Sequence, residues 1–284
     1  MIVRNGRLLA AEGVAFALDA TTGEELWRFD QESHSAFSES AADEGAFYVG
    51  TATHRVYALD QRNGAVLWST DIGPDWQYFG TIAGIAVSGD TVYAGAEQFN
   101  AENGYIATGW IVALDRATGA VLWKFRNGDG TDRRNVIGSP TVAGRLLLVS
   151  ALKGNAFFAI DRFTGQEVWR VPGAPGFVGP HQAPMVVGNV AYLASNDTYV
   201  YAVEVQTGRV IWKTRTPASN HSFAVCGDRI FVTWLGLSVL DRRTGRVLYQ
   251  QDEEATEYPT SGFAVYEDRV FVLGNRAAYA YRCR

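Results

Sequence analysis

The sequence predicts an all-β fold, a seven-bladed β-propeller of four-stranded antiparallel blades, the seventh blade having three strands. Two observations predict it. One motif with a constant internal spacing recurs six times along the 284 residues. Each copy joins a glycine-containing turn to an aromatic residue, in a chain with 13% aromatic residues and 30 glycines. Aromatic residues favour pleated strands and glycines favour tight turns, so composition and repeat agree.

The recurring motif is an acidic residue followed eight positions later by an aromatic residue. The acidic positions and their aromatic partners are, in chain order, Asp19, Asp60, Asp115, Asp161, Glu204 and Asp241, with Trp27, Trp68, Trp123, Trp169, Trp212 and Tyr249. Successive acidic residues are 41, 55, 46, 43 and 37 positions apart. A four-stranded propeller blade takes about 40–50 residues, so each copy marks one blade.

Each copy also predicts its local structure. A Thr-Gly or Asn-Gly pair in every copy supplies the positive φ that a tight turn between the third and fourth strands needs. The carboxylate of the acidic residue can accept hydrogen bonds from the backbone of this turn. The aromatic ring can lie flat between two blades, where both of its faces are removed from water. We therefore assign the repeated residues a structural role.

The two ends of the chain complete the count of blades. Residues 1–19 align without gaps to residues 223–241, and residues 262–284 supply the first three strands of the last blade. The ring then closes either by side-chain packing alone or with a natural N-terminal segment. Residues 1–284 form one domain, with blades at residues 1–33, 34–73, 80–128, 136–173, 182–217, 221–252 and 260–284.

Composition excludes several classes of protein. A net charge of −5 and a pI of about 5.4 argue against nucleic-acid binding through a basic face. The sequence has no apolar run of membrane-spanning length, and its first residues lack the apolar core of a signal peptide. The protein is thus cytoplasmic as written, or extracytoplasmic if a leader was removed or lies upstream.

The chain has two cysteines, Cys226 and Cys283, too few for a disulfide framework or a zinc cluster. We expect two structural thiols, with one long-range disulfide as the alternative.

The repeat resembles the pyrroloquinoline-quinone-like β-propeller family with its tryptophan-docking motif, and is BamB-like. That family includes quinoprotein dehydrogenases, the assembly lipoprotein BamB and sensor domains of bacterial kinases, and most members work outside the cytoplasm. The chain departs from the family motif at Asn63, Glu204, Val239 and Tyr249. The resemblance implies fold more strongly than function, because one fold supports many functions.

The resemblance also defines what a quinone site would need. The quinone dehydrogenases have a vicinal cysteine pair against the quinone and a calcium ion held by Glu, Asn and Asp. Cys226 and Cys283 are far apart in this sequence. We therefore expect no cofactor, no metal and no catalytic residue, and pyrroloquinoline quinone in particular is not expected.

Propeller topology sorts the loops onto two faces. The turns between strands one and two and between strands three and four are short, and form the short-turn face. The opposite long-loop face carries the insertions at residues 72–79, 98–109, 126–135 and 172–182. Binding residues concentrate on such loops, and the candidates are Trp76, Tyr78, Tyr105, Trp110, Arg133, Arg134 and His181.

A second candidate site is the mouth of the central channel. Alignment of the first strands places four polar residues at nearly one level there: Ser38, Gln182, His221 and Ser261. A small polar ligand or ion is the functional interpretation. The favoured interpretation is a solvated funnel with a polar lining.

Three hypotheses about function remain. The leading one is a non-catalytic binding or scaffolding propeller that engages a protein or peptide partner through the long-loop face, with exposed aromatic anchors. The first alternative is a small-molecule binder or degenerate quinoprotein-type enzyme that uses the channel mouth. The second alternative is the sensor domain of a larger membrane protein.

Overall fold

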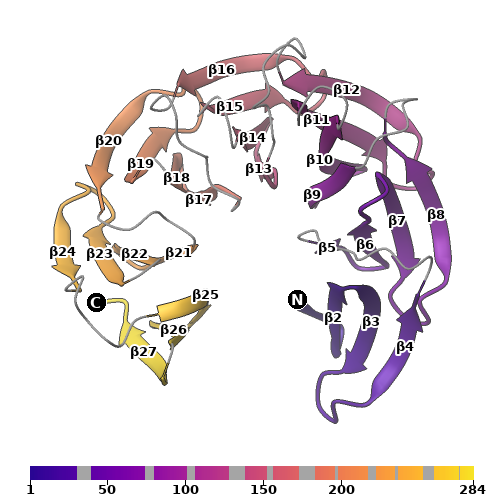
Figure 1. Ribbon diagram of the computed structural model, residues 1–284, viewed down its shortest axis with the longest axis horizontal. Helices are drawn as coiled ribbons and strands as arrows, with labels where there is room; N and C mark the ends of the chain where they lie inside the picture. Colours follow the sequence, from indigo (N-terminus) through magenta and orange to yellow (C-terminus); the bar gives the residue numbers. More distant parts are fainter. Residues whose placement is uncertain are drawn as a thin grey trace.

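The computed structural model describes residues 1–284 apart from residues 31–39, 74–79, 101–105, 128–137, 152–155, 173–182, 196–197, 217–221, 234–235, 252–258 and 275. The described residues form strands and turns, with no helix among them. Seven antiparallel sheets are arranged side by side around a central axis, six with four strands and one with three. This architecture confirms the predicted seven-bladed propeller (Figure 1).

The first four blades contain sixteen strands. Blade one has β1 (Ile2–Arg4), β2 (Arg7–Glu12), β3 (Val14–Asp19) and β4 (Glu25–Phe29). Blade two has β5 (Ala41–Ala42), β6 (Ala46–Gly50), β7 (Arg55–Asp60) and β8 (Val66–Asp71). Blade three has β9 (Gly80–Ser88), β10 (Thr91–Asn100), β11 (Ile106–Asp115) and β12 (Val121–Asn127). Blade four has β13 (Thr141–Ala143), β14 (Leu146–Ala151), β15 (Ala156–Asp161) and β16 (Glu167–Pro172).

The last three blades contain eleven strands. Blade five has β17 (Met185–Val187), β18 (Val190–Ala194), β19 (Tyr199–Glu204) and β20 (Val210–Arg215). Blade six has β21 (Ser222–Cys226), β22 (Arg229–Thr233), β23 (Leu237–Asp241) and β24 (Val247–Gln250). Blade seven has β25 (Pro259–Tyr266), β26 (Arg269–Gly274) and β27 (Ala278–Arg282). In every blade each strand pairs with the next one along the chain.

The turn between the third and fourth strands is built by the acidic residue of the repeat. In blade one, Asp19 Oδ1 accepts hydrogen bonds from the backbone N–H groups of Thr21 and Thr22, each at 2.8 Å. The glycine that follows, Gly23, has φ of +76°, where a side chain would be strained. The matching glycines share this conformation, with φ between +72° and +74° at Gly64, Gly119, Gly165, Gly208 and Gly245.

Each repeat tryptophan docks on the turn of the following blade. The indole N–H of Trp27 donates to Gln61 O at 2.8 Å, and that of Trp68 donates to Arg116 O at 2.8 Å. The ring lies so close to the next turn glycine that a Cβ on that glycine would be 2.6–2.8 Å from ring atoms at Gly64, Gly119, Gly165, Gly208 and Gly245. Glycine is therefore required at this position both by φ and by the neighbouring ring.

The hydrophobic core is divided into six clusters, one for each interface between successive blades. Each cluster is centred on a large residue of the second strand, which faces the following blade and is at most 2% exposed. These residues are Leu9, Tyr48, Tyr93, Leu148, Tyr192 and Phe231.

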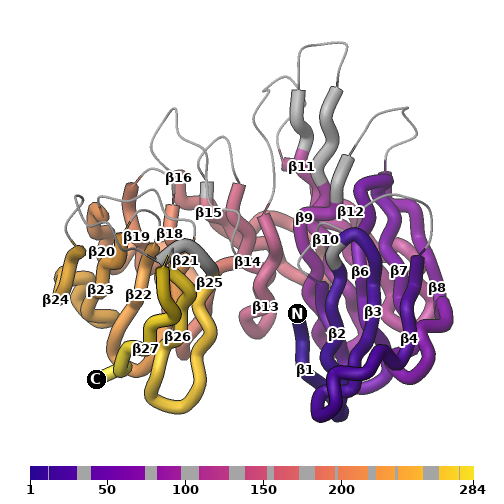
Figure 2. Tube along the Cα trace, turned by 60° about the horizontal axis from the view of Figure 1, so that its bottom comes forward, coloured from indigo at the N-terminus to yellow at the C-terminus, as the bar shows by residue number. Residues whose placement is uncertain are grey.

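The ring is open on one side. Figures 1 and 2 show a gap between β1–β4 at the N-terminus and β25–β27 at the C-terminus. Among the described residues no hydrophobic cluster joins blade seven to blade one. Closure by side-chain packing alone, one of the two sequence-based alternatives, is therefore not what this structure shows.

The two cysteines form a disulfide between blades six and seven, so the expectation of two structural thiols is wrong and the alternative is correct. Cys226 ends β21, Cys283 follows β27, and their Cα atoms are 5.2 Å apart. At this interface the docking tryptophan is replaced by Tyr249, which is 52% exposed. Cys283 holds the place whose carbonyl accepts the indole N–H in other blades, so a covalent bond replaces the docking bond.

We predict that tryptophan docking is a major source of stability. Trp68→Ala should lower the free energy of unfolding by about 3–5 kcal/mol, because it removes a buried ring and leaves a cavity. Tyr249→Ala is the matched control at the same motif position, and should cost about 0.5 kcal/mol because its ring is exposed. Urea denaturation followed by circular dichroism measures both, and equal losses would contradict the docking account.

We also predict that blade seven depends on the disulfide. Replacing both Cys226 and Cys283 by alanine should cost about 2–4 kcal/mol, because the bridge spans a separation of 57 residues. In this double variant, exchange of backbone amide hydrogens should accelerate first in β26 and remain slow in β6. A reducing agent should reproduce this pattern in the wild type and leave the double variant unaffected, and uniform acceleration in all blades would contradict the prediction.

Candidate functional site

Most of the predicted binding residues lie outside the described part of the chain. On the long-loop face these are Trp76, Tyr78, Tyr105, Arg133, Arg134 and His181. At the channel mouth Ser38, Gln182 and His221 also lie outside it, and Ser261 is described only as a backbone position in β25. Both predicted sets therefore remain predictions.

Trp110 is the one long-loop candidate that the structure describes. It lies in β11 opposite Ala96 and Arg126, and packs partly buried against the cluster between blades two and three. The Arg126 guanidinium lies over the indole, 5.3 Å from the ring centroid. Trp110 is thus partly buried in β11, and the expectation of an exposed aromatic anchor does not fit this residue.

The longest hairpin among the described strands raises part of the long-loop face. Strands β10 and β11 each have ten residues and stay paired from Thr91 and Asp115 to Asn100 and Ile106. The corresponding strands of the other blades have five or six residues. Blade three therefore extends beyond its neighbours on this face, with Trp110 midway along the hairpin.

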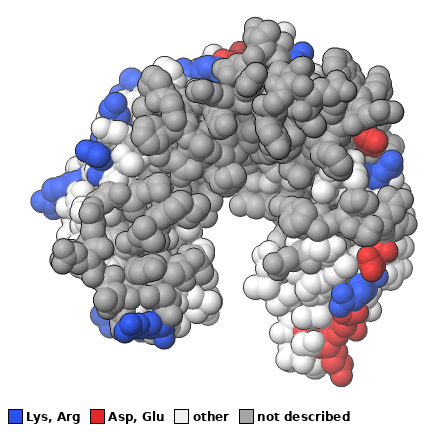
Figure 3. Space-filling view, in the orientation of Figure 1, with Lys and Arg blue, Asp and Glu red and all other residues white. Residues whose placement is uncertain are grey.

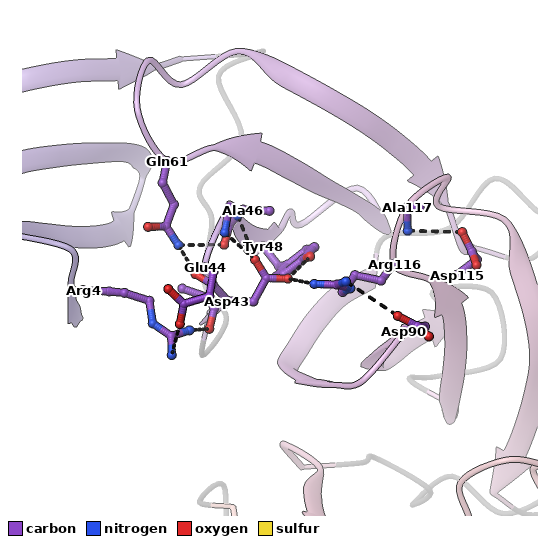
Figure 4. Close-up of polar contacts among 12 residues, drawn as sticks. Arg4, Asp43, Glu44, Ala46, Tyr48, Gln61, Asp90, Asp115, Arg116 and Ala117 are labelled. Atoms are coloured by element: carbon purple, nitrogen blue, oxygen red, sulfur yellow. Dashed lines mark hydrogen bonds and ion pairs between the residues drawn. The ribbon is translucent and has the colours of Figure 1, made fainter.

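A second candidate lies on the short-turn face, where blades two and three meet (Figure 4). Asp43, in the turn between β5 and β6, accepts a hydrogen bond from the Tyr48 hydroxyl at 2.7 Å. The same oxygen, Oδ2, lies 2.9 Å from an Arg116 guanidinium nitrogen. Arg116 follows the motif residue Asp115, and its second nitrogen lies 3.6 Å from Asp90 in the neighbouring turn.

The turn that contains Asp43 is also tied to blade one. The Gln61 side-chain amide donates to Ala46 O at 3.0 Å and to Asp43 O. Arg4 of blade one donates to Ala42 O at 2.7 Å, and its guanidinium lies 3.4 Å from Glu44. The cluster of Arg4, Asp43, Tyr48, Gln61 and Arg116 thus connects three blades through one short turn (Figure 4).

The electrostatics of this cluster fix its charge states. Burial alone would raise the pKa of Asp43, but hydrogen bonds from the backbone N–H groups of Ala46 and Gly45, from Tyr48 and from Arg116 lower it to about 2. Burial and the bond to Asp43 raise the pKa of Tyr48. At neutral pH Asp43 is therefore an anion held by a neutral phenol and a cation.

A cavity of about 600 Å³ adjoins the cluster, with Glu44, Arg62, Trp68 and Arg116 in its lining. Its cations already have acidic partners, because Arg62 lies 2.6 Å from Asp60 and Arg116 lies 2.9 Å from Asp43. Within the described residues no group of three or more His, Cys, Asp or Glu side chains could hold a metal ion. The cluster therefore holds three blades together. None of its residues forms a pair of nucleophile and general base.

Sequence reasoning missed this cluster. Asp43 and Tyr48 belong to a short turn and a core strand, and Arg116 follows a motif acid at a position that varies among the other blades, which have Ala20, Gln61, Arg162, Val205 and Arg242. Their association depends on the docking of blade two against blade three, which no spacing within one repeat reveals. The one available signal was an acidic residue in a turn between two apolar strands, which also has an ordinary capping role.

Comparison with known proteins assigns the chain to a family. The family model described as outer membrane protein assembly factor BamB matches residues 2–214 and, in a second match, residues 107–252. The chain belongs to the BamB family. Shewanella oneidensis BamB is 25% identical over 304 residues, an alignment that covers 98% of this chain and 72% of that protein.

Other relatives share the repeat. The quinoprotein ethanol dehydrogenase of Pseudomonas aeruginosa is 29% identical over 167 residues, which are 53% of this chain and 25% of the enzyme. The chain therefore matches about a quarter of that enzyme's length, and 56% of the length of Yersinia pestis BamB. The solved structure of BamB from Moraxella catarrhalis matches 96% of this chain and 80% of its own, with a TM-score of 0.71 and 20% identity, which supports the fold.

The described residues include no helix that is long and apolar enough to cross a membrane.

We predict that the Asp43 cluster makes stability depend on pH. Because the folded pKa is about 2 and the ordinary value is 3.8, ionised Asp43 stabilises the fold above pH 4 by about 2 kcal/mol. This contribution is lost as the pH falls through the folded pKa. Urea denaturation of wild type and Asp43→Asn should differ by that amount at pH 7 and converge near pH 2. A difference that does not change with pH would contradict the assignment.

Proposed function

We propose that the chain is a non-catalytic scaffold that binds a protein partner through its long-loop face, in the assembly of outer membrane proteins. The observation that carries this proposal is the family membership, with a BamB relative aligned over 98% of the chain. That relative is named as an assembly factor. The extended β10–β11 hairpin supports the choice of face, because it raises blade three beyond its neighbours on the side of the long insertions.

A quinone-dependent enzyme fits this chain less well. Quinoprotein relatives match between 48% and 72% of the chain, at the level of the shared repeat. The vicinal cysteine pair expected against a quinone is not formed by Cys226 and Cys283, which are 57 positions apart and bridge blades six and seven. These two cysteines therefore do not fit a pyrroloquinoline quinone site of that kind.

The disulfide supports a location outside the cytoplasm for this function. Disulfides persist in oxidising environments such as the periplasm and are rare where glutathione and thioredoxin keep thiols reduced. Cys226 and Cys283 are 5% and 3% exposed, so the bridge is a buried structural element. We place the working protein outside the cytoplasm, where an outer membrane assembly factor acts.

The proposal predicts functional replacement of a BamB relative. When exported by an added leader into Shewanella oneidensis that lacks its own BamB, the chain should restore outer membrane protein assembly. The double variant Trp76→Ala, Tyr105→Ala should lose most of this rescue, because aromatic anchors contribute a large share of binding energy. Levels of folded outer membrane β-barrels, measured by gel mobility with and without heating, report the outcome.

Phe163→Ala is the matched control, because Phe163 is an aromatic residue that is 59% exposed on the short-turn face. It should rescue as well as the wild type, and circular dichroism should show that all variants are folded. Failure of the wild-type chain would contradict the assembly role. Full rescue by the double variant would contradict the long-loop face.

A further inference from the structure

The short-turn face of blade four departs from a pattern that blades three and six share. In these three blades an arginine follows the acidic residue of the repeat, at Arg116, Arg162 and Arg242. The backbone N–H of each donates to a carbonyl in the turn between the first and second strands of its own blade, at 2.9, 3.1 and 2.8 Å respectively. The three arginine side chains therefore start from equivalent places in their blades.

The turn between the first and second strands supplies a carboxylate to this arginine in blades three and six. Asp90 lies 3.6 Å from Arg116, and Asp228 accepts a hydrogen bond from Arg242 at 3.3 Å. The equivalent position of blade four is Arg145. A second cation thus replaces the carboxylate of the other two blades.

Arg116 has a further carboxylate partner that blade four also lacks. Asp43 of the preceding blade lies 2.9 Å from the Arg116 guanidinium. In the blade that precedes Arg162, the position equivalent to Asp43 is Ser88. The sequence therefore removes from Arg162 both of the carboxylates that hold Arg116.

Two buried N–H groups of Arg162 are left without an acceptor. No described residue accepts a hydrogen bond from its Nε or its Nη1, whereas Arg242 has one such nitrogen beside its bond to a carboxylate. The nearest motif acid, Asp161, is already engaged. Its Oδ2 lies 2.5 Å from Arg145, and its Oδ1 accepts from two backbone N–H groups of its turn. Because a buried donor without an acceptor is costly, an anion that reaches Arg162 gains this free energy.

An exposed aromatic ring lies beside the two arginines. Phe163 is 59% exposed, and the guanidinium carbons of Arg145 and Arg162 lie 5.6 and 4.7 Å from its ring centroid. The backbone of Arg162 is fixed, because its carbonyl accepts the indole N–H of Trp123 at 3.1 Å. Arginine and aromatic residues are enriched in binding hot spots. These residues thus present two cations and an apolar surface on a rigid turn.

Blades three and six indicate which anion fits this site. The group that meets the equivalent guanidinium there is an aspartate carboxylate carried by a peptide turn. A carboxylate also matches the planar guanidinium, with which it can form two parallel hydrogen bonds. The exposed ring of Phe163 favours an apolar side chain next to that carboxylate.

We propose that Arg145, Arg162 and Phe163 bind an acidic peptide segment of a partner protein. An aspartate or glutamate of the segment accepts hydrogen bonds from Arg162, and a neighbouring apolar side chain packs on Phe163. Figure 3 shows the long-loop face, and this site lies on the opposite face. The assembly role proposed above does not use it, so the two proposals are tested separately.

A short peptide tests the site on the full chain. The peptide Leu-Asp-Glu-Leu, with both ends blocked, is added to the isotope-labelled protein, and NMR follows the backbone N–H signal of Phe163. This signal should shift saturably with a Kd of about 1 mM or below, and the affinity should fall as salt is added. The neutral peptide Leu-Asn-Gln-Leu should give no saturable shift.

Two arginine variants provide a matched pair. Arg162→Gln removes the cation but keeps the carbonyl on which Trp123 docks, and should weaken peptide binding at least about tenfold because charge-assisted hydrogen bonds are lost. Arg242→Gln changes the equivalent residue of blade six and should leave binding unchanged. A third variant, Arg145→Asp, gives blade four the carboxylate of the other two blades. It should abolish binding, because its own carboxylate then meets Arg162.

Three results would overturn the proposal. The first is the absence of a saturable shift at about 10 mM acidic peptide. The second is equal binding by the Arg162→Gln and Arg242→Gln variants, or binding by Arg145→Asp at the wild-type level, with all variants shown to be folded by circular dichroism. The third is tighter binding of inorganic phosphate, or of sedimented phosphatidylglycerol vesicles, than of the peptide. That result would assign the site to phosphate groups and not to an acidic protein segment.

Discussion

One contact holds this propeller together: the indole of one blade lying on the turn glycine of the next. It combines burial of a large ring, a hydrogen bond to a backbone carbonyl and a glycine that has both the φ and the space the ring requires. The acidic residue of the repeat serves this contact indirectly, because it fixes the turn on which the ring rests. The apolar faces of the strands in two successive blades then pack against each other beside this contact.

The repeat made the fold predictable because its residues lie within about a dozen positions of one another and its turn forms locally. Asp19, Gly23 and Trp27 lie close in sequence, and their turn chemistry is local. The count of blades and the three strands of the last blade followed from alignment of the copies. Openness of the ring could not be predicted in the same way, because it depends on how far seven wedge-shaped sheets turn around the axis.

The candidate sites were much less predictable. Asp43, Tyr48 and Arg116 meet only after two blades have docked, and no spacing relates them. The pairing of Cys226 with Cys283 likewise depends on the distance between two sheets, and two cysteines in a long chain do not reveal it. Trp110 lies in β11, and its partial burial against the cluster between blades two and three and under Arg126 depends on contacts between strands that the sequence alone does not show.

The directional nature of the docking contact has a consequence for how such chains change in evolution. Every interface joins a donor surface on one blade to a different acceptor surface on the next, so the contact is heterologous and does not specify how many units assemble. Duplication or loss of a whole blade preserves all remaining junctions and alters only the arc that they span. Blade number can therefore drift among relatives while the repeat stays recognisable, and the terminal units are where new specificity can arise.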